Sequence, residues 1–211
     1  MSRIRIFNTY EPVTDIYRHL LPELVARGIS PVVYISACDY RAGRQPIEQS
    51  AAARLVVIRR LPAIGRIADT RLLKALAAIM YLVSASLMSL FGRKVELNVF
   101  LTQPPMFGFW GVVLKRLRRQ PYVIVLMDVY PDCLIASRKD SRVGSIARFF
   151  RWMSRKTWRS ADGVVCIGRC MQELVIANGV HPSKVITIPN WADEKRIKPL
   201  PHDRNPIRID R

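Results

Sequence analysis

Polar residues follow the apolar segments of this chain at positions where they could contact a ligand. Asp128 is the candidate catalytic residue: it comes directly after the apolar run at residues 122–127, where its carboxylate could accept a hydrogen bond from a ligand hydroxyl or orient a neighbouring group. The alternative is a turn aspartate that caps the segment before Pro131. Tyr130 and Asp132 are further candidates for substrate binding, with turn shape and capping as their alternative role.

Other candidate binding residues also follow apolar runs. Thr102 and Gln103 come after residues 95–101, so their polar side chains could face a cleft. Gly168 and Arg169 open a predicted helix, whose free N–H groups and guanidinium could hold a phosphate. An ordinary strand-to-helix turn with a surface arginine explains this pair equally well. The remaining candidates for substrate binding are Tyr10, Glu11 and Asn190.

The elements that must position these residues alternate between strand and helix. Residues 3–7, 14–28 and 31–35 predict a strand, a helix and a second strand, which is a βαβ unit. Continued alternation predicts an α/β fold, a doubly wound, Rossmann-like and mostly parallel sheet of roughly six or seven strands. Ligands then bind at the carboxyl ends of the strands. The further strands are expected at 55–58, 95–101, 122–127, 163–167 and 185–188, and the further helices at 71–91, 107–118, 144–159 and 169–178.

One predicted helix is unusually apolar. Residues 75–92 form an uncharged run of 18 residues, near the lower limit of length for a membrane-spanning helix. Serines dilute the run, so a buried or interfacial helix is favoured over a transmembrane one. The apolar residues that recur at helical spacing are Leu72, Leu76, Ile79, Val83, Leu87 and Leu90.

The charge balance indicates an anionic partner. The chain has 34 Lys and Arg against 16 Asp and Glu, a formal net charge of +18. Aromatic residues interleave with cations in the segment 138–159, which is typical of a face that meets anionic lipid. A helix that packs its aromatics on the sheet and leaves its basic side in solvent is the alternative. The expected membrane-facing residues are Lys115, Arg116, Arg118, Arg119, Arg148, Arg151, Trp152, Arg155, Lys156 and Trp158.

The cysteines and histidines predict no metal site. Four cysteines and three histidines are scattered without a CxxC pair. Cys133, Cys166 and Cys170 lie in or beside apolar runs, which favours free core thiols in a reducing compartment. Because no secretory signal is visible at the N-terminus, we expect a cytoplasmic location.

Three ordered segments, at residues 102–105, 128–132 and 161–191, together resemble the family 4 glycosyltransferases of bacterial surface-polysaccharide synthesis, in particular the fucosamine-transferase and colanic-acid branch. Residues 102–105 match a TxPP motif and residues 128–132 a DxxPD/E motif. An AD-x-V strand at 161–167 runs on to a PNW terminus at 189–191. Two departures stand out: the first loop, 8–13, contains no glycine, and Met127 stands where many members have His or Gln.

The resemblance implies the N-terminal, acceptor-side domain of a two-domain GT-B enzyme. It places this domain at residues 1–193 and a linker toward an absent donor domain at 194–211. The reaction would move a sugar from a nucleotide-sugar donor, with no other cofactor, to a lipid-linked acceptor on the inner face of the cytoplasmic membrane. Alternatives are an inactive remnant and an acceptor-binding or membrane-binding subunit completed by a separate donor-domain chain. A basic nucleic-acid-binding protein has the right charge, but no nucleic-acid-binding motif supports it, so we expect no nucleic acid partner.

Overall fold

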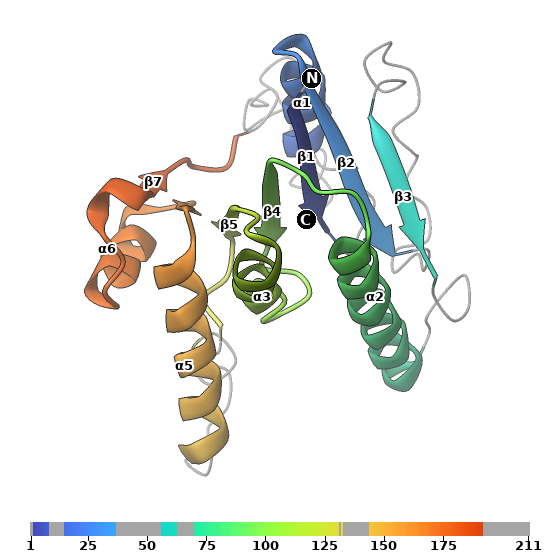
Figure 1. The fold of residues 1–211 in the computed structure, drawn as a ribbon. Helices are drawn as coiled ribbons and strands as arrows, with labels where there is room; N and C mark the ends of the chain where they lie inside the picture. The colour runs from blue at the N-terminus through green and yellow to red at the C-terminus, as the bar shows by residue number, and fades with distance from the viewer. Residues whose placement is uncertain are drawn as a thin grey trace, which may run out of the picture.

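A parallel sheet forms the centre of the protein. The computed structural model describes residues 2–8, 15–36, 56–62, 70–130, 132 and 144–191. Within these ranges seven strands lie in the order β3-β2-β1-β4-β5-β6-β7, and every neighbouring pair is parallel (Figure 1). This confirms the predicted doubly wound, Rossmann-like sheet. The strands are β1 (Ser2–Phe7), β2 (Ile29–Ser36), β3 (Val57–Leu61), β4 (Leu97–Leu101), β5 (Tyr122–Leu126), β6 (Gly163–Cys166) and β7 (Val185–Thr187).

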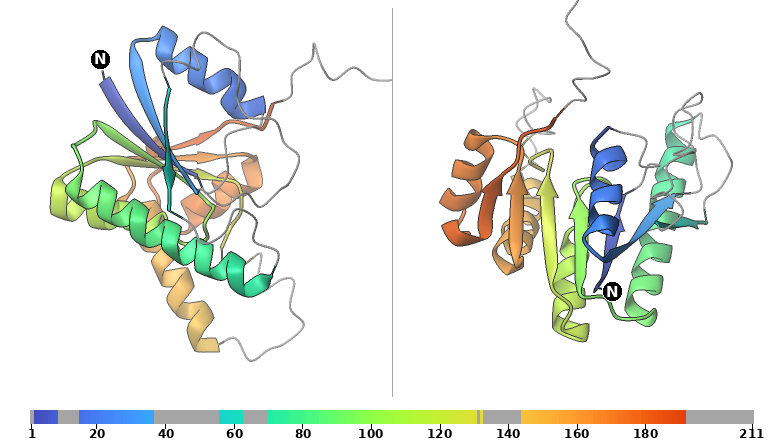
Figure 2. Two further views of the ribbon diagram at one scale, coloured as in Figure 1. Left: turned by 90° about the vertical axis from the view of Figure 1, so that its right-hand side faces the viewer. Right: turned by 90° about the horizontal axis from the view of Figure 1, so that it is seen from above.

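Helices cover both faces of the sheet (Figure 2). Helix α1 (Asp15–Ala26) packs on one face, where Leu21 and Leu24 join a core with Ile4, Ile6 and other strand residues. The opposite face is covered by α2 (Arg71–Phe91), α3 (Phe109–Arg118), α5 (Gly144–Ser160) and α6 (Arg169–Ala177). Crossovers between parallel strands are right-handed, so the direction of the crossover decides on which face its helix lies. The chain crosses the sheet in one direction from β1 to β3 and in the opposite direction from β3 to β7, which places the helices of the two parts on opposite faces.

An aromatic cluster fills the larger core. Phe7 stacks on Phe100 with ring centroids 4.5 Å apart, and Phe107 meets both rings edge-on. Tyr81 from α2 reaches the same cluster and donates a hydrogen bond of 3.0 Å from its hydroxyl to the carbonyl of Tyr34. These contacts join the two central strands β1 and β4 to the helices above them.

Helix α2 has two apolar faces, and only one of them packs on the sheet. Its buried residues are Ala77, Tyr81, Ala85 and Ser89, which repeat every four residues. Most of the repeat noted in the sequence lies on the other side, where Leu72, Ile79, Val83 and Leu87 are each at least half exposed; its last member, Leu90, packs against the core. Of the two expected alternatives, a buried or an interfacial helix, the exposure of these side chains excludes full burial and leaves the interfacial one. Within the described ranges, no helix is long and apolar enough to cross a membrane.

Strand β3 is shifted from its predicted position. The sequence predicts a strand at 55–58, whereas β3 pairs Val57 with Val32 at one end and Leu61 with Ser36 at the other. Arg59 and Arg60 lie within the strand and are exposed. Charged side chains are tolerated there because β3 is at the edge of the sheet. Residues 192–211, which include the predicted linker, lie outside the described part of the chain.

Candidate functional site

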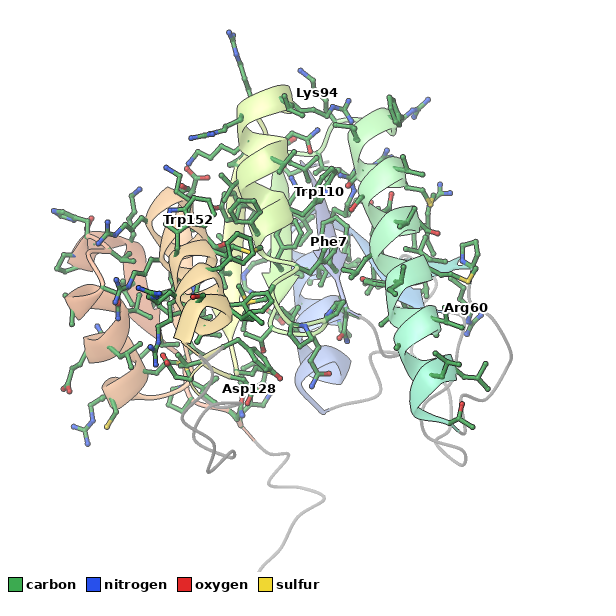
Figure 3. The ribbon with its side chains drawn as sticks, turned by 90° about the horizontal axis from the view of Figure 1, so that it is seen from below. Phe7, Arg60, Lys94, Trp110, Asp128 and Trp152 are labelled. Carbon is green, nitrogen blue, oxygen red and sulfur yellow. The ribbon has the colours of Figure 1, made fainter. Side chains whose placement is uncertain are left out.

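Parallel strands bring the candidate residues to a single edge of the sheet. Thr102 follows β4, Asp128 lies two residues after β5, Gly168 lies two residues after β6, and Asn190 lies three residues after β7. Figure 3 shows Asp128 at this carboxyl edge and Lys94, which precedes β4, at the opposite edge. Tyr10 and Glu11, expected in the loop after β1, lie outside the described residues.

A small pocket opens at this edge between the ends of β4 and β5 and the helices α3 and α5. Its volume is about 40 Å³, room for one or two water-sized groups and less than a whole sugar. Of the predicted binding residues, it brings together Thr102, Asp128 and Tyr130. The other predicted binding residues within the described ranges do not line it. The lining residues are Leu101, Thr102, Met106, Gly108, Phe109, Ile124, Leu126, Asp128, Tyr130, Ser154, Thr157 and Trp158.

Two polar side chains in the pocket have unused hydrogen-bonding capacity. The Thr102 hydroxyl oxygen is buried and has no hydrogen-bond partner among the described residues. No hydrogen bond joins the half-buried Asp128 carboxylate to another described residue. A buried hydroxyl without a partner costs about 1–3 kcal/mol, which a polar group entering the pocket would recover. The pocket therefore offers the half-buried Asp128 carboxylate as an acceptor and is lined by a residue whose buried hydroxyl lacks a partner among the described residues.

Helix α5 holds the turn that contains Asp128. The Ser154 hydroxyl donates a 2.8 Å hydrogen bond to the Tyr130 carbonyl, and Arg151 forms a 2.8 Å ion pair with Asp132. Arg151, expected on a membrane face, and Asp132, expected in substrate binding, thus pair with each other, and both roles stay predictions. Ser154 is not among the predicted site residues; the feature that indicates it is its position on the buried side of α5, four residues before Trp158.

The remaining predicted positions on the carboxyl edge lie apart from the pocket. Gln103, Arg169 and Asn190 are exposed, and Gly168 is the residue before α6. A Cβ atom added at Gly168 would meet nothing within 4 Å, so the space in front of this helix terminus is open. Phosphate binding at Gly168 and Arg169 stays a prediction.

Within the described ranges, the predicted basic face divides into cations with polar partners and residues without a polar partner. Lys115 binds Asp162, Arg118 donates to the carbonyls of Ser89 and Gly92, and Arg155 donates to Asn178. Arg148 donates to groups in the first turn of its own helix. Arg116, Arg119 and Trp152 are exposed, and Lys156 is half-buried. The expectation for Trp158 is wrong, because its side chain is only 6% exposed and belongs to the core.

Asp162, from the AD motif, is a structural residue. One carboxylate oxygen lies 2.6 Å from the Lys115 ammonium, and the other accepts a 3.0 Å hydrogen bond from the backbone N–H of Tyr122. The Asp162 backbone N–H donates in turn to the Tyr122 carbonyl. These bonds join the start of β5 to the turn before β6, which sets the register of two strands that end near the pocket.

We expect Asp162→Ala to lower the free energy of unfolding by about 1–2 kcal/mol, because the Tyr122 N–H loses its acceptor and Lys115 loses its ion pair. Urea denaturation followed by circular dichroism measures the change. Asp162→Asn keeps an acceptor for the N–H and should lose less. Equal stability of the alanine variant and the parent chain would rule out the structural role.

Of the two described cysteines, Cys166 is a core thiol as expected, whereas Cys170 is exposed, so the expectation of a core position is wrong for Cys170. Cys166 is buried, and burial raises the pKa of its thiol, which keeps it protonated and unreactive. In the residues that the structure describes, no group of three His, Cys, Asp or Glu side chains could hold a metal ion.

Comparisons with known proteins agree with this architecture. A probable glycosyltransferase from Pseudomonas aeruginosa, WbjE, is 30% identical over 86 residues, which are 41% of this chain and 22% of that protein. Sucrose-phosphate synthase from Thermosynechococcus elongatus superposes on 95% of the chain with a TM-score of 0.61 and 14% identity. Anabaena HepE, solved in complex with UDP-glucose, superposes on 100% of the chain with a TM-score of 0.56 and 13% identity.

These likenesses differ in what they establish. The solved structures are distant in sequence and show the fold alone, and this chain spans 51% and 50% of their lengths. The model of the glycosyl transferase 4-like domain matches residues 13–191, which is most of the chain. The protein therefore belongs to the family of glycosyl transferase 4-like domains.

Proposed function

We propose that this chain forms the acceptor-side half of a GT-B glycosyltransferase. The enzyme would transfer a sugar from a nucleotide-sugar donor to a lipid-linked acceptor in bacterial surface-polysaccharide synthesis. Family membership supports glycosyl transfer, and the ordered motifs at 102–105, 128–132 and 161–191 support the fucosamine-transferase and colanic-acid branch. A donor-binding domain would complete the cleft, either elsewhere on the same polypeptide or on a separate chain.

The pocket at the carboxyl edge carries this proposal. Thr102 and Asp128 come from neighbouring strands and line the same small space, where the Thr102 hydroxyl has no partner among the described residues. A sugar hydroxyl both donates and accepts hydrogen bonds, so it can satisfy Asp128 and Thr102 together. We infer that this pair orients the acceptor hydroxyl toward the anomeric carbon of the donor, which lowers the entropic part of the barrier.

Release of nucleoside diphosphate tests the proposal. The chain is incubated with a panel of nucleotide sugars and a bacterial membrane extract, alone and together with a candidate donor-binding domain. We expect release to depend on the donor-binding domain and on the extract. Release without the extract would contradict transfer to a lipid-linked acceptor, and no release from any mixture would favour the inactive remnant.

A further inference from the structure

Helix α2 carries an apolar strip on its outer side that no described residue covers. The strip faces away from the sheet, opposite to the buried residues Ala77, Tyr81 and Ala85. With a rise of about 1.5 Å per residue, the 21-residue helix extends the strip over roughly 30 Å. A strip of this size is rare on a monomeric soluble protein and indicates an interaction surface. The α2 strip consists of Leu72, Leu76, Ile79, Val83, Leu87 and Phe91, which are 36–79% exposed.

The neighbouring helices of the same layer add aromatic residues. Figure 3 views this layer from outside the sheet, with α2, α3 and α5 side by side and Trp152 on α5. Trp152 lies with its ring centroid 6.0 Å from that of Phe109 on α3 and 6.0 Å from that of Phe149 on α5. Phe149 and Trp152 are each more than half exposed. Large aromatic rings at the surface of a protein favour the headgroup region of a bilayer.

The charge of this layer decides what the surface binds. Helices α2, α3 and α5 contain no Asp or Glu, whereas they contain two, three and five Lys or Arg respectively. Acidic residues nearby lie in the flanking turns, where Asp132 and Asp162 pair with cations of this layer. A second copy of the chain would bring a surface of the same sign and the same net charge of +18. Anionic lipid supplies the opposite charge together with apolar chains.

We propose that the α2 strip inserts into the interface of an anionic lipid bilayer, with α2 lying along the membrane surface and the cations of α3 and α5 contacting the headgroups. The apolar strip and the basic flanks have the composition of an interfacial helix. The first turns of α2 lie toward the edge of the sheet where Asp128 is located (Figure 3). The inference concerns the lipid surface itself and stands whether or not the proposed transfer occurs.

Flotation with lipid vesicles tests the inference without donor or acceptor. The full chain is mixed with vesicles of phosphatidylcholine alone or with one third phosphatidylglycerol, and the bound fraction gives a partition coefficient. We expect binding to the anionic vesicles and a decrease as salt is raised. The triple variant Ile79→Gln, Val83→Gln and Leu87→Gln should bind on the order of 100-fold more weakly, since three half-exposed apolar side chains no longer enter the interface.

A matched control separates the α2 strip from general surface hydrophobicity. Ile186 on β7 is as exposed as Ile79 but lies outside this helical layer, so Ile186→Gln should bind vesicles like the parent chain. Circular dichroism and the thermal midpoint verify that each variant folds. Unchanged vesicle binding by the folded triple variant would overturn the inference. The inference would also be overturned if the parent chain did not bind vesicles but formed a dimer that the triple variant cannot form.

Discussion

Asp128→Asn is expected to lower the rate of sugar transfer by the completed enzyme by roughly 100-fold or more, with little loss of stability. Positioned carboxylates that handle a reacting hydroxyl typically contribute factors of this size. The amide keeps the shape of the side chain but loses its charge and offers N–H donors where the acceptor hydroxyl needs an oxygen. The ratio kcat/KM for the acceptor measures the loss, and urea denaturation measures stability.

A neighbouring carboxylate of the same turn supplies the control. Asp132 does not line the pocket and pairs with Arg151, with both side chains 44% exposed. Exposed pairs contribute little to stability, so Asp132→Asn should change neither transfer nor folding by much. If Asp128→Asn transfers sugar normally but unfolds more easily, Asp128 is a turn-capping residue and the proposed role is wrong.

Gly111→Ala is expected to lower the free energy of unfolding by about 2–3 kcal/mol, because the added methyl group overpacks the core. A Cβ atom at this position would lie 2.5 Å from Cδ2 of the Tyr122 ring. The ring cannot move aside easily, since it is fully buried and its hydroxyl donates a 2.7 Å hydrogen bond to the carbonyl of Thr157. Helix α3 must then shift away from β5, whose end forms part of the pocket.

Chemical denaturation of Gly111→Ala and Gly144→Ala tests this packing argument. Gly144 begins α5, and a Cβ atom there would meet nothing within 4 Å. Alanine also favours helix over glycine, so Gly144→Ala should be neutral or slightly stabilising. A Gly111→Ala variant as stable as Gly144→Ala would show that the Tyr122 ring has room to move.

Short-range patterns were sufficient to predict much of the fold. The apolar runs before Thr102 and Asp128 lie in β4 and β5, and Arg71–Phe91 is a helix over the predicted range. Alternation of strand and helix implies parallel strands, and parallel strands bring their carboxyl ends together. Thr102 and Asp128 could thus be placed at one edge, although 26 residues separate them along the chain.

Contacts between distant elements were not predictable in the same way. The pairing of Arg151 with Asp132 and the hydrogen bond from Ser154 to Tyr130 depend on where α5 crosses the end of β5. Trp158 was placed on a membrane face because it lies among cations, yet it is buried against the sheet. Composition identifies a helix with aromatic and basic residues, but not which aromatic faces inward.

By itself the sequence determined the alternation of elements, the edge where ligands are expected and the excess of positive charge, because these depend on local periodicity and composition. Tertiary structure alone decided which side of α2 packs on the sheet. Both sides of this helix are apolar, so periodicity cannot choose between them. The small side chains of Ala77 and Ala85 allow α2 to approach the sheet closely, and the Tyr81 hydroxyl donates a hydrogen bond to a backbone carbonyl on β2. The α2 strip is therefore left facing outward.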